Sequence, residues 1–217
     1  MALYYDERAP EYDEVYSGGG PAFPKPGLYK QDVDAIIKMV KGFGAGSIID
    51  VACGTGFWLP YYAGNCTKIT LLDQSGKMLA ECKERTKRFG IIAKCNFIHS
   101  DFFNSVFEME SFDSAVVGFF ISHLRDDRME SFFQKLNDIL KSGARLLIID
   151  SVWSELRQKY RQKEEIQIRT LKHGREFGVF KRYMSPKEVE EMVERYRYES
   201  REQFYGHAFQ AIVAVKE

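Results

Sequence analysis

The chain has 217 residues, with 31 Lys and Arg balanced by 31 Asp and Glu, so its formal net charge is zero. This length predicts one domain with a sizeable buried core. A neutral chain has no general electrostatic affinity for phosphate backbones, which disfavours nucleic acid as a partner. Aromatic residues make up 14% of the chain, and many lie outside the predicted strands, which favours a pocket for a flat or apolar ligand.

The cysteines show neither a C-x-x-C spacing nor a neighbouring pair of histidines. They are Cys53, Cys66, Cys82 and Cys95. We therefore expect buried, reduced thiols and no metal site. The N-terminus has no apolar run suited to export, and no segment approaches the length of a membrane span, so the sequence predicts a cytoplasmic protein without a membrane anchor.

The N-terminal residues 1–27 combine several tyrosines with acidic residues, glycines and prolines. The part from Ser17 to Pro26 is too rich in Gly and Pro for a regular element, so the sequence predicts a flexible arm. From Val33 to Val40, apolar residues recur at three and four positions, which predicts an amphipathic helix.

The stretch from Ser47 to Trp58, S-I-I-D-V-A-C-G-T-G-F-W, carries the strongest ligand signal. Its β-branched residues on both sides of Asp50 predict a buried parallel strand. Gly54 and Gly56 permit a sharp turn and let a flat ligand approach the backbone. Such a loop at the carboxyl edge of a sheet binds nucleotide-like ligands. The pattern G-x-G-x-x-G of nicotinamide enzymes fails, because its third glycine is replaced by Leu59.

A second predicted strand, from Lys68 to Asp73, also ends in an acid. In nucleotide-binding α/β folds, an acidic residue about 20 residues beyond the glycine loop accepts hydrogen bonds from ribose hydroxyls. Asp73 has that spacing. The helix predicted after it, Ser75 to Arg88, places Met78 in its first turn.

The middle of the chain predicts more buried strands, at Asn96–Ile98, Phe112–Phe120 and Lys141–Asp150. A helix is expected between the last two strands, where Asp127 and Glu130 have the spacing of a capping box.

The last third begins with a long, charged segment, residues 151–184. We expect a helix over Glu155–Ile168 and a hairpin over Arg169–Tyr183, as an insertion that covers the substrate. Ser185, Pro186 and Glu188 then predict a capped helix start. The chain should end with two strands, at Glu199–Phe204 and Ala208–Val215.

These segments resemble, in order, the motifs of the class I S-adenosylmethionine-dependent methyltransferases. D-V-A-C-G-T-G, from Asp50 to Gly56, resembles motif I, with Ala52 in place of the first glycine. H-S-D-F-F, at 99–103, resembles the motif whose aspartate hydrogen-bonds the adenine amino group. I-S-H-L-R-D-D, at 121–127, resembles the H-L-x-D turn after the fourth strand.

The resemblance implies a doubly wound α/β domain over residues 1–217, with a mostly parallel seven-stranded sheet, helices on both faces and an antiparallel C-terminal hairpin. Residues 1–27 would form a cap arm and residues 151–184 a substrate-covering insertion. The cofactor would be S-adenosyl-L-methionine. Its implied contacts are Asp50, Ala52, Cys53, Gly54, Thr55, Gly56, Asp73, Gln74, Met78, Asp101, Phe102, Gly118 and Phe119. The candidate acceptor contacts are Tyr5, Tyr12, Tyr16, Trp58, Phe120 and His123.

The expected reaction is polar methyl transfer to oxygen, nitrogen or carbon of a small molecule, in which the protein chiefly aligns the acceptor. If the acceptor is a hydroxyl, His123 is the candidate general base, because imidazole titrates near neutrality. Two alternatives remain open. One is an RNA or protein methyltransferase that uses the basic residues of the insertion, and the other is a cofactor-binding subunit without catalysis. The oligomeric state is left open.

Overall fold

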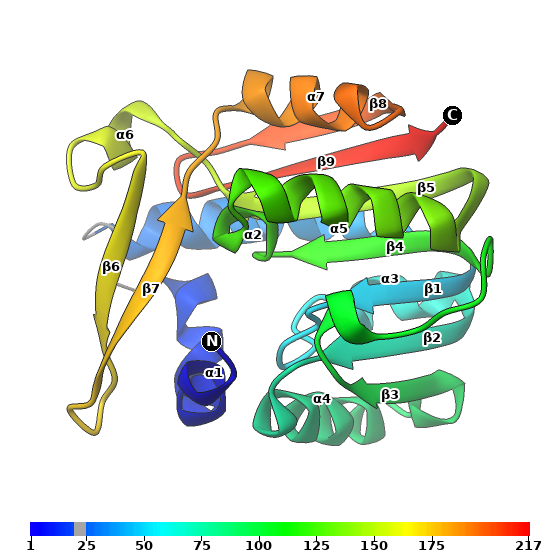
Figure 1. The fold of residues 1–217 in the computed structure, drawn as a ribbon. Helices are drawn as coiled ribbons and strands as arrows, with labels where there is room; N and C mark the ends of the chain where they lie inside the picture. Colours follow the sequence, from blue (N-terminus) through cyan, green and yellow to red (C-terminus); the bar gives the residue numbers. More distant parts are fainter. Residues whose placement is uncertain (20–24) are drawn as a thin grey trace.

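The computed structural model describes residues 1–19 and 25–217, and within them a seven-stranded sheet forms the centre of the molecule (Figure 1). The strand order is β3-β2-β1-β4-β5-β9-β8. The strands are β1 Gly46–Val51, β2 Cys66–Asp73, β3 Cys95–His99, β4 Phe112–Gly118, β5 Leu140–Ser151, β8 Tyr198–Tyr205 and β9 Phe209–Lys216. β1 to β5 are parallel, whereas β9 is antiparallel to both β5 and β8. The predicted doubly wound sheet with an antiparallel C-terminal hairpin is confirmed.

The strand order reverses between β1 and β4. From β1 the chain builds outward through β2 to β3, then returns to β4 on the other side of β1. The loops after β1 and β4 therefore diverge, and in open α/β sheets the crevice at this switch point is where ligands bind.

Helices cover both faces of the sheet because each buries one apolar stripe. Their bounds are α2 Pro26–Lys41, α3 Leu59–Tyr62, α4 Gly76–Arg88, α5 Asp126–Ile139 and α7 Pro186–Arg195. Apolar residues of α2, α3 and α4 share one core cluster, and those of α5 and α7 share the other. The two faces thus pack independently against the same strands.

Two predicted helix caps have different outcomes. Ser185 and Glu188 form a capping box at α7, where the Glu188 backbone N–H donates to Ser185 Oγ at 3.3 Å and the Ser185 N–H donates to Glu188 Oε2 at 2.8 Å. The box expected for Asp127 and Glu130 is wrong. α5 begins two residues earlier, at Asp126, and its N-cap residue, Arg125, makes no capping bond through its side chain.

The N-terminus forms helices instead of the predicted flexible arm. α1 spans Ala2–Arg8, and a 3₁₀ helix, η1, spans Ala9–Ser17. Aromatic packing accounts for this order: Tyr4 packs with Leu171 and Val179, and Tyr16 stacks on Phe57 with ring centroids 3.8 Å apart. Half of the predicted irregular stretch, residues 20–24, lies outside the described residues, and Pro26 already begins α2.

The charged segment after β5 is mainly a hairpin, formed by β6 Glu164–Thr170 and β7 Glu176–Arg182. The predicted helix is present only as α6, Glu155–Gln158, so its extension to Ile168 is wrong. Polar and apolar residues alternate from Glu165 to Arg169, and a period of two favours a strand. Figure 1 shows this hairpin beside α1, at one end of the sheet.

Candidate functional site

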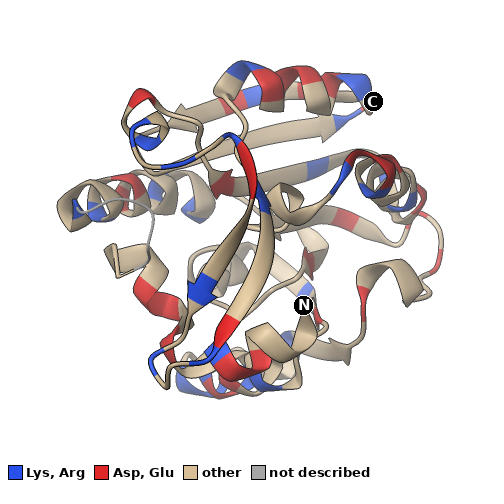
Figure 2. Cartoon of the chain, turned by 60° about the vertical axis from the view of Figure 1, so that its left-hand side comes forward, with Lys and Arg blue, Asp and Glu red and all other residues tan. Residues whose placement is uncertain are grey.

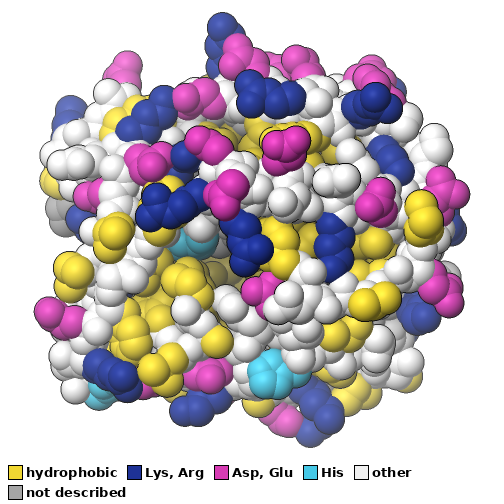
Figure 3. Space-filling model, viewed as in Figure 1, with side chains coloured by type: hydrophobic (Ala, Val, Ile, Leu, Met, Phe, Trp, Pro, Cys, Tyr) yellow, Lys and Arg dark blue, Asp and Glu magenta, His cyan; other side chains and the backbone are white. Residues whose placement is uncertain are grey.

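A cavity of about 350 Å³ lies at the carboxyl ends of β1, β2 and β4, beneath α1. Figure 3 shows hydrophobic side chains in a hollow near the middle of one face, with Lys and Arg beside it. Most of the predicted contacts line this cavity. They are Tyr5, Tyr12, Ala52, Gly54, Asp73, Gln74, Met78, Asp101, Phe102, Gly118, Phe119, Phe120 and His123. The fold thus brings together residues separated by more than half of the chain.

The loop after β1 turns by left-handed backbone conformations, with φ of 55° at Ala52, 54° at Gly54 and 71° at Gly56. Glycine adopts this region freely, whereas an alanine there costs of the order of 1 kcal/mol. Asp73 holds the turn, because its Oδ2 accepts a hydrogen bond of 2.9 Å from the Gly54 N–H. The loop is therefore fixed by the same acid that faces the cavity.

Asp73 also accepts a 2.8 Å hydrogen bond from the Ser75 N–H through Oδ1. Each carboxylate oxygen keeps further acceptor capacity, which suits the two hydroxyls of a ribose. Burial raises the pKa of Asp73 to about 6, against an ordinary value of 3.8, so the group is largely ionised at neutral pH.

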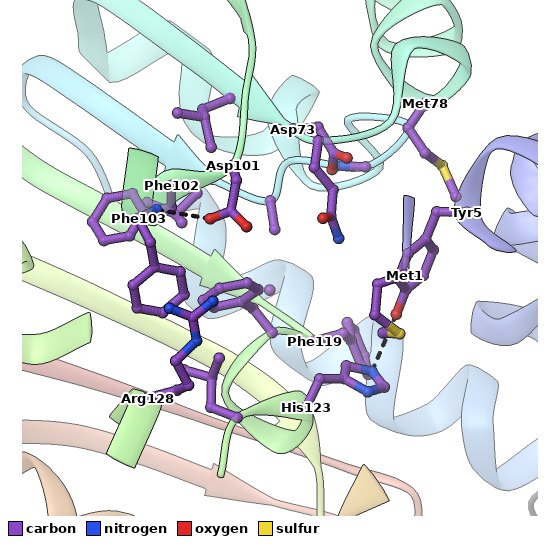
Figure 4. Close-up of a pocket in the computed structure, with 18 of the residues that line it drawn as sticks. Met1, Tyr5, Asp73, Met78, Asp101, Phe102, Phe103, Phe119, His123 and Arg128 are labelled. Atoms are coloured by element: carbon purple, nitrogen blue, oxygen red, sulfur yellow. Dashed lines mark hydrogen bonds between the residues drawn. The ribbon is translucent and has the colours of Figure 1, made fainter. Parts of the chain in front are cut away.

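Asp101 and two apolar neighbours form another part of the cavity lining. Asp101 Oδ1 accepts a 2.8 Å hydrogen bond from the Phe103 N–H, and Figure 4 shows the carboxylate pointing into the open space. Phe102 and Phe103 supply apolar surface beside it, and Met78 supplies apolar surface on the other side of Asp73 (Figure 4). A flat base with an exocyclic amino group fits this combination of a carboxylate and apolar walls.

His123 lies on the opposite side, under the N-terminal cap (Figure 4). Its Nδ1 is 2.7 Å from the Phe180 carbonyl oxygen, and its Nε2 is 3.2 Å from the Tyr5 hydroxyl. Since a carbonyl only accepts, Nδ1 carries the proton and Nε2 accepts from Tyr5. Burial, with a smaller effect of the Lys181 charge, lowers the pKa of His123 to about 3. The imidazole is therefore neutral at physiological pH, in contrast to the expected titration near neutrality.

A buried ion pair supports this region from behind. Lys181 Nζ lies 3.1 Å from Asp150 Oδ1 and donates to Ser122 Oγ at 2.5 Å. The side chains of Lys181 and Asp150 are 5% and 1% exposed. A buried pair with its hydrogen bonds satisfied gives little net stability but fixes the positions of its partners. It ties β7 to the turn that carries His123.

Several predicted contacts lie outside the cavity lining. Tyr16 and Trp58 are buried in the core under the N-terminal helices. Asp50 accepts a 2.6 Å hydrogen bond from the Tyr62 hydroxyl, and Thr55 Oγ1 donates to Asp13 Oδ1 at 2.5 Å.

Two motif residues have packing roles. Cys53 is buried in the same core, and its N–H donates to the Leu72 carbonyl at 3.0 Å. A Cβ on Gly56 would lie 2.7 Å from the Cys82 sulfur, so only glycine fits there. These residues shape the loop from below, and a direct ligand contact by them stays a prediction.

Sequence reasoning missed nine lining residues. They are Met1, Val51, Leu72, Ser100, Phe103, Leu124, Arg125, Arg128 and Phe180. Leu124 and Arg125 belong to the H-L-R-D-D turn, so the motif held a signal for them. No sequence motif indicated that Phe180 lines the cavity, because its position depends on how β7 packs across the domain.

The described residues contain no cluster of three or more His, Cys, Asp or Glu side chains arranged to hold a metal. Within the same residues, no helix has both the length and the apolar character needed to span a membrane.

Comparisons with known proteins point to one family. Residues 48–143 match the family described as "Methyltransferase domain". The "Ubiquinone/menaquinone biosynthesis C-methyltransferase UbiE" of Rhizobium meliloti (strain 1021) is 31% identical over 129 residues, which cover 57% of this chain and 49% of that protein. The chain therefore spans about half the length of the curated relatives it matches.

Solved structures share the fold over nearly the whole chain. The "DhpI-SAM-HEP complex" superposes with a TM-score of 0.79 and 24% identity, covering 99% of this chain and 95% of that one. The "[4+2]-Cyclase SpnF" superposes with a TM-score of 0.68 and 16% identity, covering 99% and 95%. Since a methyl donor complex and a cyclase share this fold, the fold alone does not define the reaction.

Proposed function

We propose that this chain, a member of the class I S-adenosylmethionine-dependent methyltransferase family, transfers a methyl group to oxygen, nitrogen or carbon of a small-molecule acceptor. When bound, the cofactor supplies a sulfonium-activated methyl group. The observation that carries the proposal is one cavity, which joins the glycine loop, Asp73 and Asp101 to an aromatic wall that includes Tyr5 and Phe119.

Different parts of the cavity would hold different parts of the cofactor. Asp73 would accept hydrogen bonds from the ribose, and Asp101 would accept one from the adenine amino group. The backbone at Gly54 and Gly118 would border the methionine part, because neither has a side chain to obstruct it. Met78 and Phe102 would pack against the base.

The chain's main task in the reaction would be alignment. The acceptor lone pair would form a bond to the methyl carbon as the carbon–sulfur bond breaks, which would leave S-adenosylhomocysteine, and any proton on the acceptor atom would pass to water. Well-oriented reactants gain up to about 7–11 kcal/mol from positioning alone. Tyr5, Tyr12 and Phe120 would enclose the acceptor, and neutral His123, whose Nε2 accepts from the Tyr5 hydroxyl, would hold that hydroxyl in place.

The charge distribution supports a small acceptor over RNA. Basic residues of the hairpin region are paired with acids: Lys172 with Glu14, Arg175 with Glu7, Lys163 with Glu188, and Arg182 with Asp126 and Glu164. Figure 2 accordingly shows blue and red segments interspersed along the chain. A surface that binds nucleic acid presents a basic patch free to contact phosphates.

Methyl-labelled S-adenosylmethionine tests the proposal. The protein is incubated with it and with a panel of phenols, quinols, amines and carboxylic acids, and mass spectrometry follows S-adenosylhomocysteine and labelled products. We expect one acceptor class to be methylated. Labelling of RNA or protein alone would contradict a small acceptor. Tight cofactor binding with no turnover, together with copurification of a catalytic partner, would indicate a subunit without catalysis.

A further inference from the structure

A second, smaller cavity of about 50 Å³ lies beside the first, under α1 and the β6–β7 hairpin. The two share four wall residues: Tyr5, Tyr12, Phe119 and His123. One water-sized group needs about 10–15 Å³ of such volume, so the small cavity has room for a group of a few heavy atoms. It is therefore adjacent to the place where we propose that the acceptor binds.

Two guanidinium groups line this small cavity without an acid beside them. Arg8 Nη1 donates to the Tyr4 hydroxyl at 2.6 Å, and its guanidinium carbon lies 5.1 Å from the centre of the Tyr12 ring. Arg169 Nη2 donates to the amide oxygen of Gln167. Among residues 1–19 and 25–217, neither guanidinium has a carboxylate within salt-bridge distance. All of these partners are neutral.

The other charged groups near the cavity are paired with a charge, bonded to the backbone or set back. Lys181 is paired with Asp150. Arg157 donates to backbone carbonyls through Nε and Nη2. Glu165 accepts a hydrogen bond of 2.6 Å from Gln167 Nε2. The amide of Gln167 therefore links the Glu165 carboxylate to the Arg169 guanidinium, and the two charged groups are not in direct contact. Arg8 and Arg169 therefore leave an excess of positive charge at the small cavity.

Two like charges held together away from water cost free energy unless an anion joins them. Burial and the nearby positive charge of Arg8 both lower the pKa of Arg169, yet a guanidinium remains protonated in proteins. Arginine also matches oxyanions geometrically, because its fork of N–H groups can donate two parallel hydrogen bonds.

We propose that the small cavity binds an oxyanion of the methyl acceptor, a carboxylate or a phosphate group, through Arg8 and Arg169. This inference rests on the proposed function for the role of the anion as part of the acceptor, whereas the anion site itself stands on the two arginines. An anionic acceptor would also be attracted to the positive sulfonium of the cofactor, and the guanidinium groups would orient it toward the wall that the two cavities share.

Nuclear magnetic resonance tests the site with inorganic phosphate and acetate as probes, each with and without S-adenosylhomocysteine. Line broadening of ³¹P in phosphate, and of ¹³C in labelled acetate, reports binding to wild type. In Arg169→Gln and Arg8→Gln the affinity should fall about tenfold or more, because a charge-assisted hydrogen bond is lost. Arg201→Gln, an exposed residue of β8 paired with Glu199, is the matched control and should bind the probes like wild type.

The outcomes separate the two proposals. Tighter binding of phosphate would assign a phosphate-bearing acceptor, and tighter binding of acetate a carboxylate-bearing one. Absence of binding of both probes to wild type, or equal binding to wild type and to a folded Arg169→Gln or Arg8→Gln variant, would overturn the oxyanion site. Calorimetry with S-adenosylhomocysteine on each variant gives the second readout: its affinity should stay within about threefold of wild type. Failure of wild type to bind S-adenosylhomocysteine would instead count against the proposed function.

Discussion

Asp50 is a buried carboxylic acid near the end of β1, and its surroundings disfavour the ionised form of the carboxyl group. Burial raises its pKa to about 7, against an ordinary 3.8, although the hydrogen bond from Tyr62 opposes the shift. An acid with a raised pKa in the folded state contributes stability that is complete below pH 3.8 and is lost as the pH rises through 7. The folded protein is therefore destabilised by this group on the alkaline side.

Asp50→Asn keeps an oxygen for Tyr62 and removes the titration. Between pH 5 and pH 8, wild type should lose about 2–3 kcal/mol of stability relative to the variant. Urea unfolding at several pH values measures this difference. The control is Asp34→Asn, an exposed carboxylate on α2. Parallel pH profiles for wild type and Asp50→Asn would contradict the assigned environment.

His123 provides the second test on the scale of a single residue. Because burial lowers its pKa to about 3, its imidazole signals should not titrate between pH 5 and pH 8. Nuclear magnetic resonance of the four histidines measures this, and His123→Asn identifies the signal that belongs to it. A midpoint near 6.5 would restore His123 as a conventional general base and contradict the neutral hydrogen-bond acceptor described above.

At the scale of elements, two hydrogen bonds join α1 to the start of α4. Asp6 of α1 accepts hydrogen bonds from Ser75 Oγ at 2.6 Å and from the Lys77 N–H at 3.2 Å. Both donors lie at the start of α4, directly after Asp73. The same contacts that close the cavity thus reach the segment that is proposed to bind ribose.

Asp6→Ala should therefore loosen α1 and raise the dissociation constant for S-adenosylhomocysteine about three- to tenfold, since one or two exposed hydrogen bonds are lost. Calorimetry measures the constant, and thermal unfolding should show little change because α1 packs in a small satellite cluster. Asp34→Ala serves as control. An unchanged dissociation constant would mean that α1 does not close over the cofactor.

The N-terminus and the hairpin also show where sequence reasoning stopped. The tyrosine pattern predicted a cap, but the glycines and prolines after Ser17 suggested a flexible arm. The N-terminal helices are ordered because their tyrosines pack against Leu171 and Phe57, which lie far away in the sequence. The alternation from Glu165 to Arg169 carried a strand signal that helical composition obscured.

On the scale of the whole molecule, the parallel strands were predictable because local motifs follow one another in the order of the fold. Asp73 ends β2 and Asp101 follows β3 by two residues, so sequence alone placed them at the same edge of the sheet. Residues 48–143 match the family described as "Methyltransferase domain", and solved structures share the fold, as the motifs led us to expect. Arg8 and Arg169 are 161 positions apart in the sequence and line the same cavity only because of tertiary packing, so no local pattern predicted that cavity.

The most direct test of the central claim is calorimetric binding of S-adenosylmethionine and S-adenosylhomocysteine to wild type and to Asp73→Asn, with Asp34→Asn as the matched control. We expect wild type and the control to bind both, and Asp73→Asn to bind at least about a hundredfold more weakly, because an amide cannot accept from the Gly54 N–H, the Ser75 N–H and a ribose together. Failure of folded wild type to bind either compound, or equal binding by Asp73→Asn, would contradict the account.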